Sequence, residues 1–267
     1  MNAAVFRHVL RQNLLRLVVV GAALTGWGTL MPIIYATFGV QMREIVGQFP
    51  ALEQFMNFGG GNMFTLSGSI AVGYIHPITI ALLAVFAIVL PLSGVAGERQ
   101  RGTLEIVLAR PVSRRAYLLT LLVGSTLFIG LAMAAMLLGT LASATALDVI
   151  DELTVGNVPA LWLNGVGLYF AIAAISFAAS VSFDRVAPAA AIVGTIVLVA
   201  YFLQIIGSLW PDADWLQPYS LFHYLNPDAT LTVGLQAFDV VVLAIVGAVG
   251  VVYALIVFPR RDLAAPA

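Results

Sequence analysis

The stretch GERQRGTLEIVLARPVSRR, residues 97–115, separates two long apolar runs and carries much of the charge of the chain. Its seven charged side chains are those of Glu98, Arg99, Arg101, Glu105, Arg110, Arg114 and Arg115. On either side of the stretch, the chain continues almost without charge. An apolar run of roughly 20 residues is long enough to cross a bilayer as a helix. The stretch therefore predicts a polar connection between two membrane-spanning helices.

The composition of the whole chain indicates a membrane protein. Of its 267 residues, 61% are hydrophobic and 9% are charged, whereas about a quarter of the residues in soluble domains carry charge. A soluble fold would have nowhere to bury so much apolar surface. The chain has neither Cys nor Lys. Disulfides, a Schiff-base enzyme and a P-loop nucleotide site are therefore excluded, because each requires one of these residues.

The apolar runs predict an all-α polytopic membrane protein with one transmembrane domain over residues 1–267. Six spans are expected, at residues 14–38, 75–96, 117–146, 161–183, 186–209 and 238–258. Short interfacial helices are expected in residues 39–74. Short re-entrant or interfacial helices are expected in residues 206–237, before the last span, because this segment combines many aromatic residues with three prolines.

The arginines predict the orientation in the membrane, because cytoplasmic loops are enriched in basic residues. If both termini are cytoplasmic, only Arg43 lies outside, and the other arginines share the inner side. These are Arg7, Arg11, Arg16, Arg99, Arg101, Arg110, Arg114, Arg115, Arg185, Arg260 and Arg261. We therefore expect a multi-pass protein of the plasma membrane with both termini in the cytoplasm. The first apolar run is too long for a typical signal peptide.

Residues 2–16 precede the first span and allow two interpretations. Apolar Val5, Val9 and Leu10 recur at helical spacing, with Arg7 and Arg11 between them. This pattern suits an interfacial helix whose arginines contact anionic lipid headgroups. It also suits a simple cytoplasmic extension of the first span.

Within residues 97–115, the pattern predicts a short amphipathic helix on the cytoplasmic side. Gly97 is expected to end the second span, Thr103 to cap the short helix, and Ser113 to cap the third span. Leu104, Val107 and Leu108 fall on one face, which we expect to be exposed, and Pro111 ends the helix. Headgroup anchoring explains Arg114 and Arg115 alone. A docking surface for a cytoplasmic protein also explains the acidic residues and the apolar stripe.

The same stretch resembles a signature of permease subunits of type-2 ATP-binding-cassette (ABC) transporters, E-x-x-x-G-T-L-E-x-x-L-x-x-P-x-S-R. The matching residues are Glu98, Gly102, Thr103, Leu104, Glu105, Leu108, Pro111, Ser113 and Arg114. The later stretch YSLFHYLNP, residues 219–227, resembles the last outer loop of the same family, with Leu221 where a Pro is usual.

The resemblance implies that residues 97–115 couple this chain to a separate cytoplasmic ATPase. The expected docking residues are Glu98, Arg101, Gly102, Thr103, Leu104, Glu105 and Leu108. Two ATPase copies and a second permease copy or paralogue would complete the transporter, surrounded by membrane lipids and without nucleic acid. ATP and Mg²⁺ would bind the partner, so this chain is expected to be no enzyme and to bind no cofactor. The family also favours export over import.

Few polar residues lie within the predicted spans. Candidates for the transport pathway, or for helix packing, are Thr25, Ser125, Thr126, Ser176, Ser180 and Gln204. Ion-driven transporters usually keep ionisable groups at mid-membrane, and none is expected there in this chain. A hydrophobic or amphipathic cargo therefore fits best.

Two other classes of function remain open. A non-transporting membrane anchor could recruit a cytoplasmic partner through the same short helix. A membrane-embedded enzyme would need a polar constellation, but neither HExxH nor GxSxG occurs in the sequence. The three histidines, His8, His76 and His223, are expected to be interfacial side chains rather than metal ligands.

Overall fold

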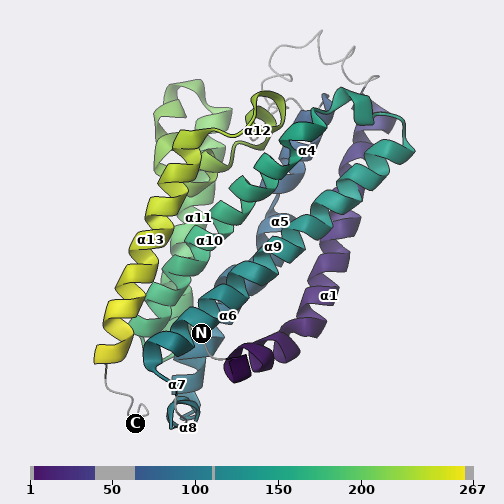
Figure 1. Cartoon of the computed structure of the whole chain (residues 1–267). Helices are drawn as coiled ribbons and strands as arrows, with labels where there is room; N and C mark the ends of the chain where they lie inside the picture. The colour runs from purple at the N-terminus through teal and green to yellow at the C-terminus, as the bar shows by residue number, and fades with distance from the viewer. Residues whose placement is uncertain (1–2, 40–63, 110–111, 262–267) are drawn as a thin grey trace.

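The computed structural model of the chain describes residues 3–39, 64–109 and 112–261, apart from the side chain of Val107. Within these ranges the protein is a bundle of helices and has no strand (Figure 1). Six helical segments are long and apolar enough to cross a membrane. The prediction of an all-α fold with six membrane-spanning helices is therefore confirmed.

The six long segments are built from one or more helices each. They are α1 (Ala3–Ile34) with η1 (Tyr35–Gly39); α5 (Pro77–Ala84), η3 (Val85–Val89), α6 (Leu90–Leu92), η4 (Ser93–Gly97) and α7 (Glu98–Gln100); α9 (Arg114–Ala146); η6 (Val155–Asn157) with α10 (Val158–Ser182); α11 (Val186–Leu209); and α13 (Ala237–Arg260). The shorter elements are α4 (Leu66–Ile75), α8 (Leu104–Leu108), η5 (Ile150–Glu152), η7 (Pro211–Tyr219), η8 (Leu221–Leu225) and α12 (Pro227–Val233).

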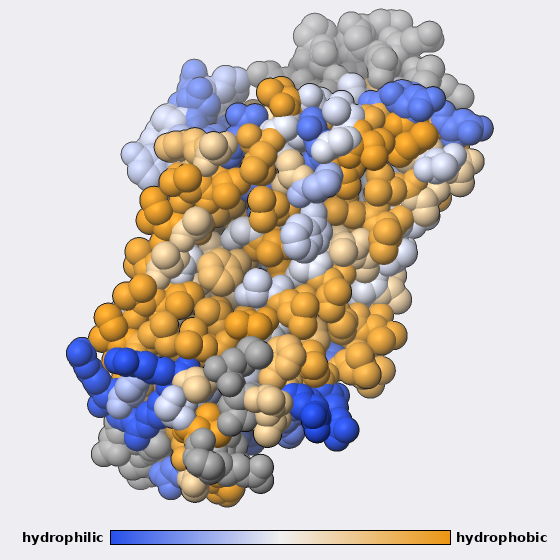
Figure 2. Space-filling model, in the orientation of Figure 1, coloured by the Kyte–Doolittle hydropathy of each residue, from blue (hydrophilic) through white to orange (hydrophobic). Residues whose placement is uncertain are grey.

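The start of α1, the end of α13 and the short helix α8 lie at the same end of the bundle, the lower end in Figure 1. We call this the terminal end. The two ends differ from the middle in polarity, because a hydrophobic band separates regions where hydrophilic side chains gather (Figure 2). A polar–apolar–polar sequence along the bundle is the distribution that a bilayer requires.

The N-terminal residues belong to α1, which is continuous from Ala3 to Ile34. Its first turns run across the terminal end before the helix turns along the bundle (Figure 1). One face of these turns is covered, since Val9 and Asn13 are buried, while Arg7 and Arg11 are exposed. Residues 3–16 therefore extend the first long helix and are bent away from its later direction, and their contact with lipid headgroups stays a prediction.

The second long segment is irregular, and its ends differ from the expected 75–96. His76 is extended, and Pro77 starts a new helix, in agreement with the preference of Pro for the first helical position. The imidazole Nδ1 of His76 accepts a hydrogen bond from the Ile78 amide, which makes this side chain a helix cap. The expectation that Gly97 ends the helix was wrong, because the helix continues through Gln100.

Close backbone packing brings α1 against α9. A Cβ atom at Gly139 would lie 2.2 Å from the carbonyl oxygen of Thr25, and one at Gly28 would lie 2.2 Å from that of Met136. Small residues allow such approach between membrane helices. By contrast, a Cβ atom at Gly26 or Gly194 would meet nothing within 4 Å among the described residues.

The segment before the last long helix forms the short helical elements η7, η8 and α12 at the opposite end. Ser220, between η7 and η8, donates a hydrogen bond to the carbonyl of Ala200 on α11 at 2.6 Å. This bond holds the segment against the bundle. The other expected outer helices fall largely in residues 40–63, which lie outside the described residues together with Arg43.

Candidate coupling site

The connection between α7 and α8 is a closed turn built around Gly102. The Thr103 amide donates to the Glu98 carbonyl at 3.0 Å, and the Gly102 amide donates to the Arg99 carbonyl at 2.9 Å. These two bonds form a Schellman motif, which requires a left-handed residue after the helix. Gly102 fills that position with a φ of +69°, where a side chain would be strained. Gly102 therefore has a clear structural role at this turn.

Glu98 joins the two sides of the turn. Its carboxylate accepts hydrogen bonds from the Thr103 hydroxyl and from the Arg101 guanidinium, the latter at 2.6 Å. Thr103 occupies the residue before α8, but its side chain makes no hydrogen bond to that helix. The expected capping by Thr103 was thus wrong, because its hydroxyl is used to fix the turn.

The helix α8 has one covered side and one exposed side. Leu104 is only 1% exposed and packs into the main hydrophobic core, with Leu108 partly buried against that core. The expectation of an exposed Leu104 stripe was therefore wrong, because the protein buries this residue itself. Glu105 and Ile106 face outward instead, and Ile106 is 68% exposed. Pro111 lies outside the described residues.

The residues after α8 attach it to the long helices. Ser113 caps α9 as expected, since its hydroxyl accepts a hydrogen bond from the Ala116 amide at 3.2 Å. Arg114 donates to the carbonyls of Pro259 at 3.0 Å and of Arg261 at 2.7 Å. Carbonyls at the end of a helix lack partners within it. Arg114 therefore ties the start of α9 to the end of α13.

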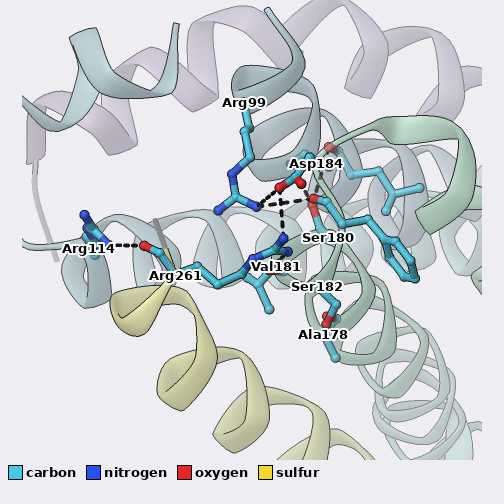
Figure 3. A network of polar contacts seen from close by, with 11 residues as sticks. Arg99, Arg114, Ala178, Ser180, Val181, Ser182, Asp184 and Arg261 are labelled. Carbon is cyan, nitrogen blue, oxygen red and sulfur yellow. Dashed lines mark hydrogen bonds and ion pairs between the residues drawn. The ribbon is translucent and has the colours of Figure 1, made fainter. Parts of the chain in front are cut away.

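A second set of contacts ties α7 to the turn between α10 and α11 (Figure 3). Arg99 forms an ion pair with Asp184 at 3.3 Å and also donates to the Phe183 carbonyl. Arg261 reaches the same Asp184 oxygen at 2.9 Å and donates to the Val181 carbonyl at 2.8 Å. One carboxylate thus holds two guanidinium groups, one from α7 and one from the residue directly after α13.

Arg99 is buried, with 1% of its surface exposed. Its Nε and Nη2 have no hydrogen-bond partner among the described residues. A buried cation depends strongly on its partner, so Asp184 is the group that holds this end of α7 in place. On the same helix, the Gln100 side chain accepts a hydrogen bond from the Val186 amide at the start of α11.

These contacts join the ends of α7, α9, α10, α11 and α13 to one another, and α8 follows α7 through the turn at Gly102. The sequence indicated positive charge here, but it did not reveal which carboxylate the arginines share. Asp184 and Arg185 form a short polar turn between two apolar runs, which is the one signal that could have suggested a role for this acid.

Three of the candidate polar residues in the spans bond to a neighbouring helix. The Ser180 hydroxyl donates to the Pro91 carbonyl at 2.9 Å and accepts from the Ala96 amide at 3.0 Å. Ser125 donates to the carbonyl of Phe86. These carbonyls lie in or beside the π-helical turns of the second segment, where regular hydrogen bonding is interrupted. Thr25 donates to Ala135 of α9 at 3.1 Å.

The remaining candidates are bonded locally or only partly bonded. Thr126 donates to Leu122 and Ser176 to Ile172, both within their own helices. The Oε1 atom of Gln204 is buried and has no hydrogen-bond partner among the described residues. The structure thus gives three of these six side chains, Thr25, Ser125 and Ser180, a part in helix packing.

The described residues contain no group of three His, Asp or Glu side chains that could hold a metal ion. Comparison with known proteins gives one finding about the family. A family model described as ABC-2 family transporter protein matches residues 6–263, which is nearly the whole chain. No curated protein matches the sequence.

Proposed function

Because this chain belongs to the ABC-2 transporter family, in which the membrane subunit works with an ABC ATPase, we propose that it is driven through α8 by a separate ATPase subunit. The supporting observation is the exposure of Glu105 and Ile106 on a helix that is otherwise fixed to the bundle. An apolar side chain and a charge side by side on an exposed surface suit a protein partner. The proposed docking set is therefore Arg101, Glu105 and Ile106, because Leu104 and Leu108 pack against the core.

The other members of the expected docking set act by shaping the helix. Glu98, Gly102 and Thr103 form the turn, and Leu104 anchors α8 in the core. In this proposal, the ATPase contacts the exposed face, and the buried face passes the movement to α7 and α9. The hydrogen-bonded ends of α10, α11 and α13 follow.

The terminal end is cytoplasmic in this proposal, and the protein lies in the plasma membrane. The arginines at that end and the location of α8 there both support this orientation. Two ATPase subunits would act with two permeases, the second being a copy or a paralogue. ATP and Mg²⁺ belong to the ATPase, which agrees with the absence of Lys from this chain.

We further propose export of a hydrophobic or amphipathic cargo. The long helices expose many large apolar side chains and few polar ones. The candidate polar residues are mostly engaged with backbone carbonyls, so they offer little to a charged solute. A cargo that enters from the bilayer needs no polar path.

Co-purification tests this proposal. The chain and its ATPase subunit would be expressed together, and the double variant E105R/I106D would be compared with D151R/V155D. The control makes the same changes at exposed residues of the opposite end. We expect E105R/I106D to lose the ATPase while it remains folded in the membrane, and D151R/V155D to retain it. Retention of the ATPase by both variants would overturn docking at α8. A wild-type complex that forms but carries out no ATP-driven transport would favour the membrane-anchor alternative.

A further inference from the structure

A groove of about 1030 Å³ lies at the terminal end, between the first turns of α1 and the α7–α8 connection. Its size is that of a ligand site. Four arginines line it, namely Arg7, Arg11 and Arg16 from α1 and Arg101 from the end of α7. One carboxylate, that of Glu98, lines it with them. The groove is therefore strongly cationic.

The single carboxylate is already engaged. Glu98 accepts bonds from Arg101 and from the Thr103 hydroxyl, so it does not neutralise the arginines of α1. Arg7 and Arg11 are exposed and form no ion pair within the described part of the chain. Arg16 has one side-chain partner in the described ranges, the neutral Asn13, to which it donates at 3.1 Å. Among the described residues, an anion in this groove would meet three arginines of α1 that no carboxylate neutralises.

The rest of the groove lining combines apolar side chains with the polar ones of His8, Gln12, Asn13, Ser93 and Tyr117. Val9 and Leu121 are buried beneath the arginines, and Leu90 lines the side formed by the second long segment. Next to Arg16, Leu14 and Leu15 are 59% and 74% exposed. Apolar side chains exposed to this degree suit lipid rather than water. Leu14 and Leu15 do not line the groove, but both lie about one helical turn or less from Arg11 and Arg16, which do. Cations of the groove and exposed apolar side chains are therefore neighbours on this stretch of α1.

We propose that this groove binds an anionic phospholipid from the inner leaflet. The phosphate lies between Arg7, Arg11 and Arg16, and an acyl chain follows the apolar surface beside Leu14 and Leu15. Guanidinium groups pair with phosphate oxygens through charged hydrogen bonds. An acidic segment of a protein would satisfy the arginines but would leave the apolar face uncovered, so the mixed chemistry favours the lipid. The proposal rests on the proposed function only because that function assigns the terminal end to the cytoplasmic side of the membrane.

A lipid bound in this groove would also lie beside the proposed docking region. Arg101 and Ile106 line the same groove, and both belong to the proposed docking region. A lipid between α1 and α7–α8 would therefore contact the element that carries the ATPase. Its occupancy would stabilise one position of α8 relative to the start of α1.

Native mass spectrometry of the full-length chain without the ATPase tests the proposal. The protein would be titrated with phosphatidylglycerol and with phosphatidylcholine of the same acyl chains. The variant R7Q/R11Q would be compared with R115Q/R185Q, which removes the same charge from exposed arginines outside the groove. Each basic residue near an anionic headgroup contributes about fivefold in affinity, so R7Q/R11Q should bind phosphatidylglycerol roughly 30-fold more weakly.

We expect the wild type and R115Q/R185Q to bind phosphatidylglycerol alike and to prefer it to phosphatidylcholine. An equal loss in both variants, or no preference for the anionic lipid, would overturn the site. Glycerol phosphate at the same concentration should not displace phosphatidylglycerol. If it competes equally well, the ligand of the groove is a free phosphate and not a lipid. Co-purification with the ATPase is a separate measurement, in which loss of association by R7Q/R11Q with unchanged lipid binding would assign the groove to the protein partner instead. Because the titration omits the ATPase, its result is independent of docking at Glu105 and Ile106.

Discussion

Arg99, in the last turn of the second long segment, and Asp184, in the turn between α10 and α11, form an ion pair at 3.3 Å. The side chain of Arg99 is fully buried, whereas that of Asp184 is 47% exposed. Asp184 also binds Arg261, so it has two cationic partners while Arg99 has one acidic partner. The pair is asymmetric, and its two members should respond differently to substitution.

Asp184→Asn should destabilise the protein more than Arg99→Met. Without the carboxylate, a buried guanidinium is left uncompensated, and we expect a loss of about 2 kcal/mol after allowance for the exposure of Asp184. Arg99→Met removes the buried charge and leaves Asp184 paired with Arg261. Thermal unfolding in detergent measures both, with the exposed Asp212→Asn as the control. The reverse order of stabilities would show that Arg99 does not depend on Asp184.

Gly102→Ala should destabilise the turn between α7 and α8. Its φ of +69° strains any residue with a Cβ atom, at a cost of about 1–2 kcal/mol. The matched control is Gly156→Ala, because a Cβ atom at either glycine would meet nothing within 4 Å, but Gly156 lacks a positive φ. Thermal unfolding should separate the two variants. Equal unfolding temperatures would mean that the turn relaxes without cost.

Ser180→Ala should weaken the contact between α10 and the second long segment. The change leaves the Ala96 amide without its partner in a buried place, which costs about 1–3 kcal/mol. Ser176→Ala is the control, since the Ser176 hydroxyl is equally buried but bonds only its own helix. If Ser180 instead contacts cargo, its substitution would change transport and leave the unfolding temperature unaltered.

Leu104→Ala and Ile106→Ala should affect different properties. Leu104 is buried in the core, and its truncation should cost about 2–4 kcal/mol of stability. Ile106 is exposed, so its truncation should leave the unfolding temperature within a degree or two of the wild type but weaken ATPase binding. Unfolding temperature and co-purification, measured on the same preparations, check both statements. A stable Leu104→Ala protein would contradict the anchoring of α8.

The long helices could be predicted from the sequence, because their formation in a membrane depends on hydrophobicity and length alone. Runs such as that of α11 exceed the thickness of a bilayer core, and their length decides the outcome. The Ser113 cap was also predictable, because a hydroxyl before a long helix has a local partner. These features need no knowledge of other parts of the chain.

Other features depend on distant contacts and could not be predicted. The partner of Arg99 lies 85 residues away in the sequence, and Arg114 bonds carbonyls at the end of the last helix. Leu104 was expected to be exposed because helical spacing defines a face but does not say what covers it. Similarly, carbonyls in and beside the π-helical turns near Pro91 accept hydrogen bonds from hydroxyls of α9 and α10. Only the packed bundle brings these groups together.

Cross-linking from α8 tests the central claim most directly. The natural chain contains no Cys, so Ile106→Cys places a single thiol at the exposed side chain of α8. A thiol-linked photo-cross-linker at this position should join the chain to its ATPase subunit in membranes, while Val155→Cys at the opposite end should not. An Ile106→Cys adduct with the mass of the two subunits would support docking at α8. Cross-linking from Val155→Cys alone, or from neither position in an intact complex, would contradict it.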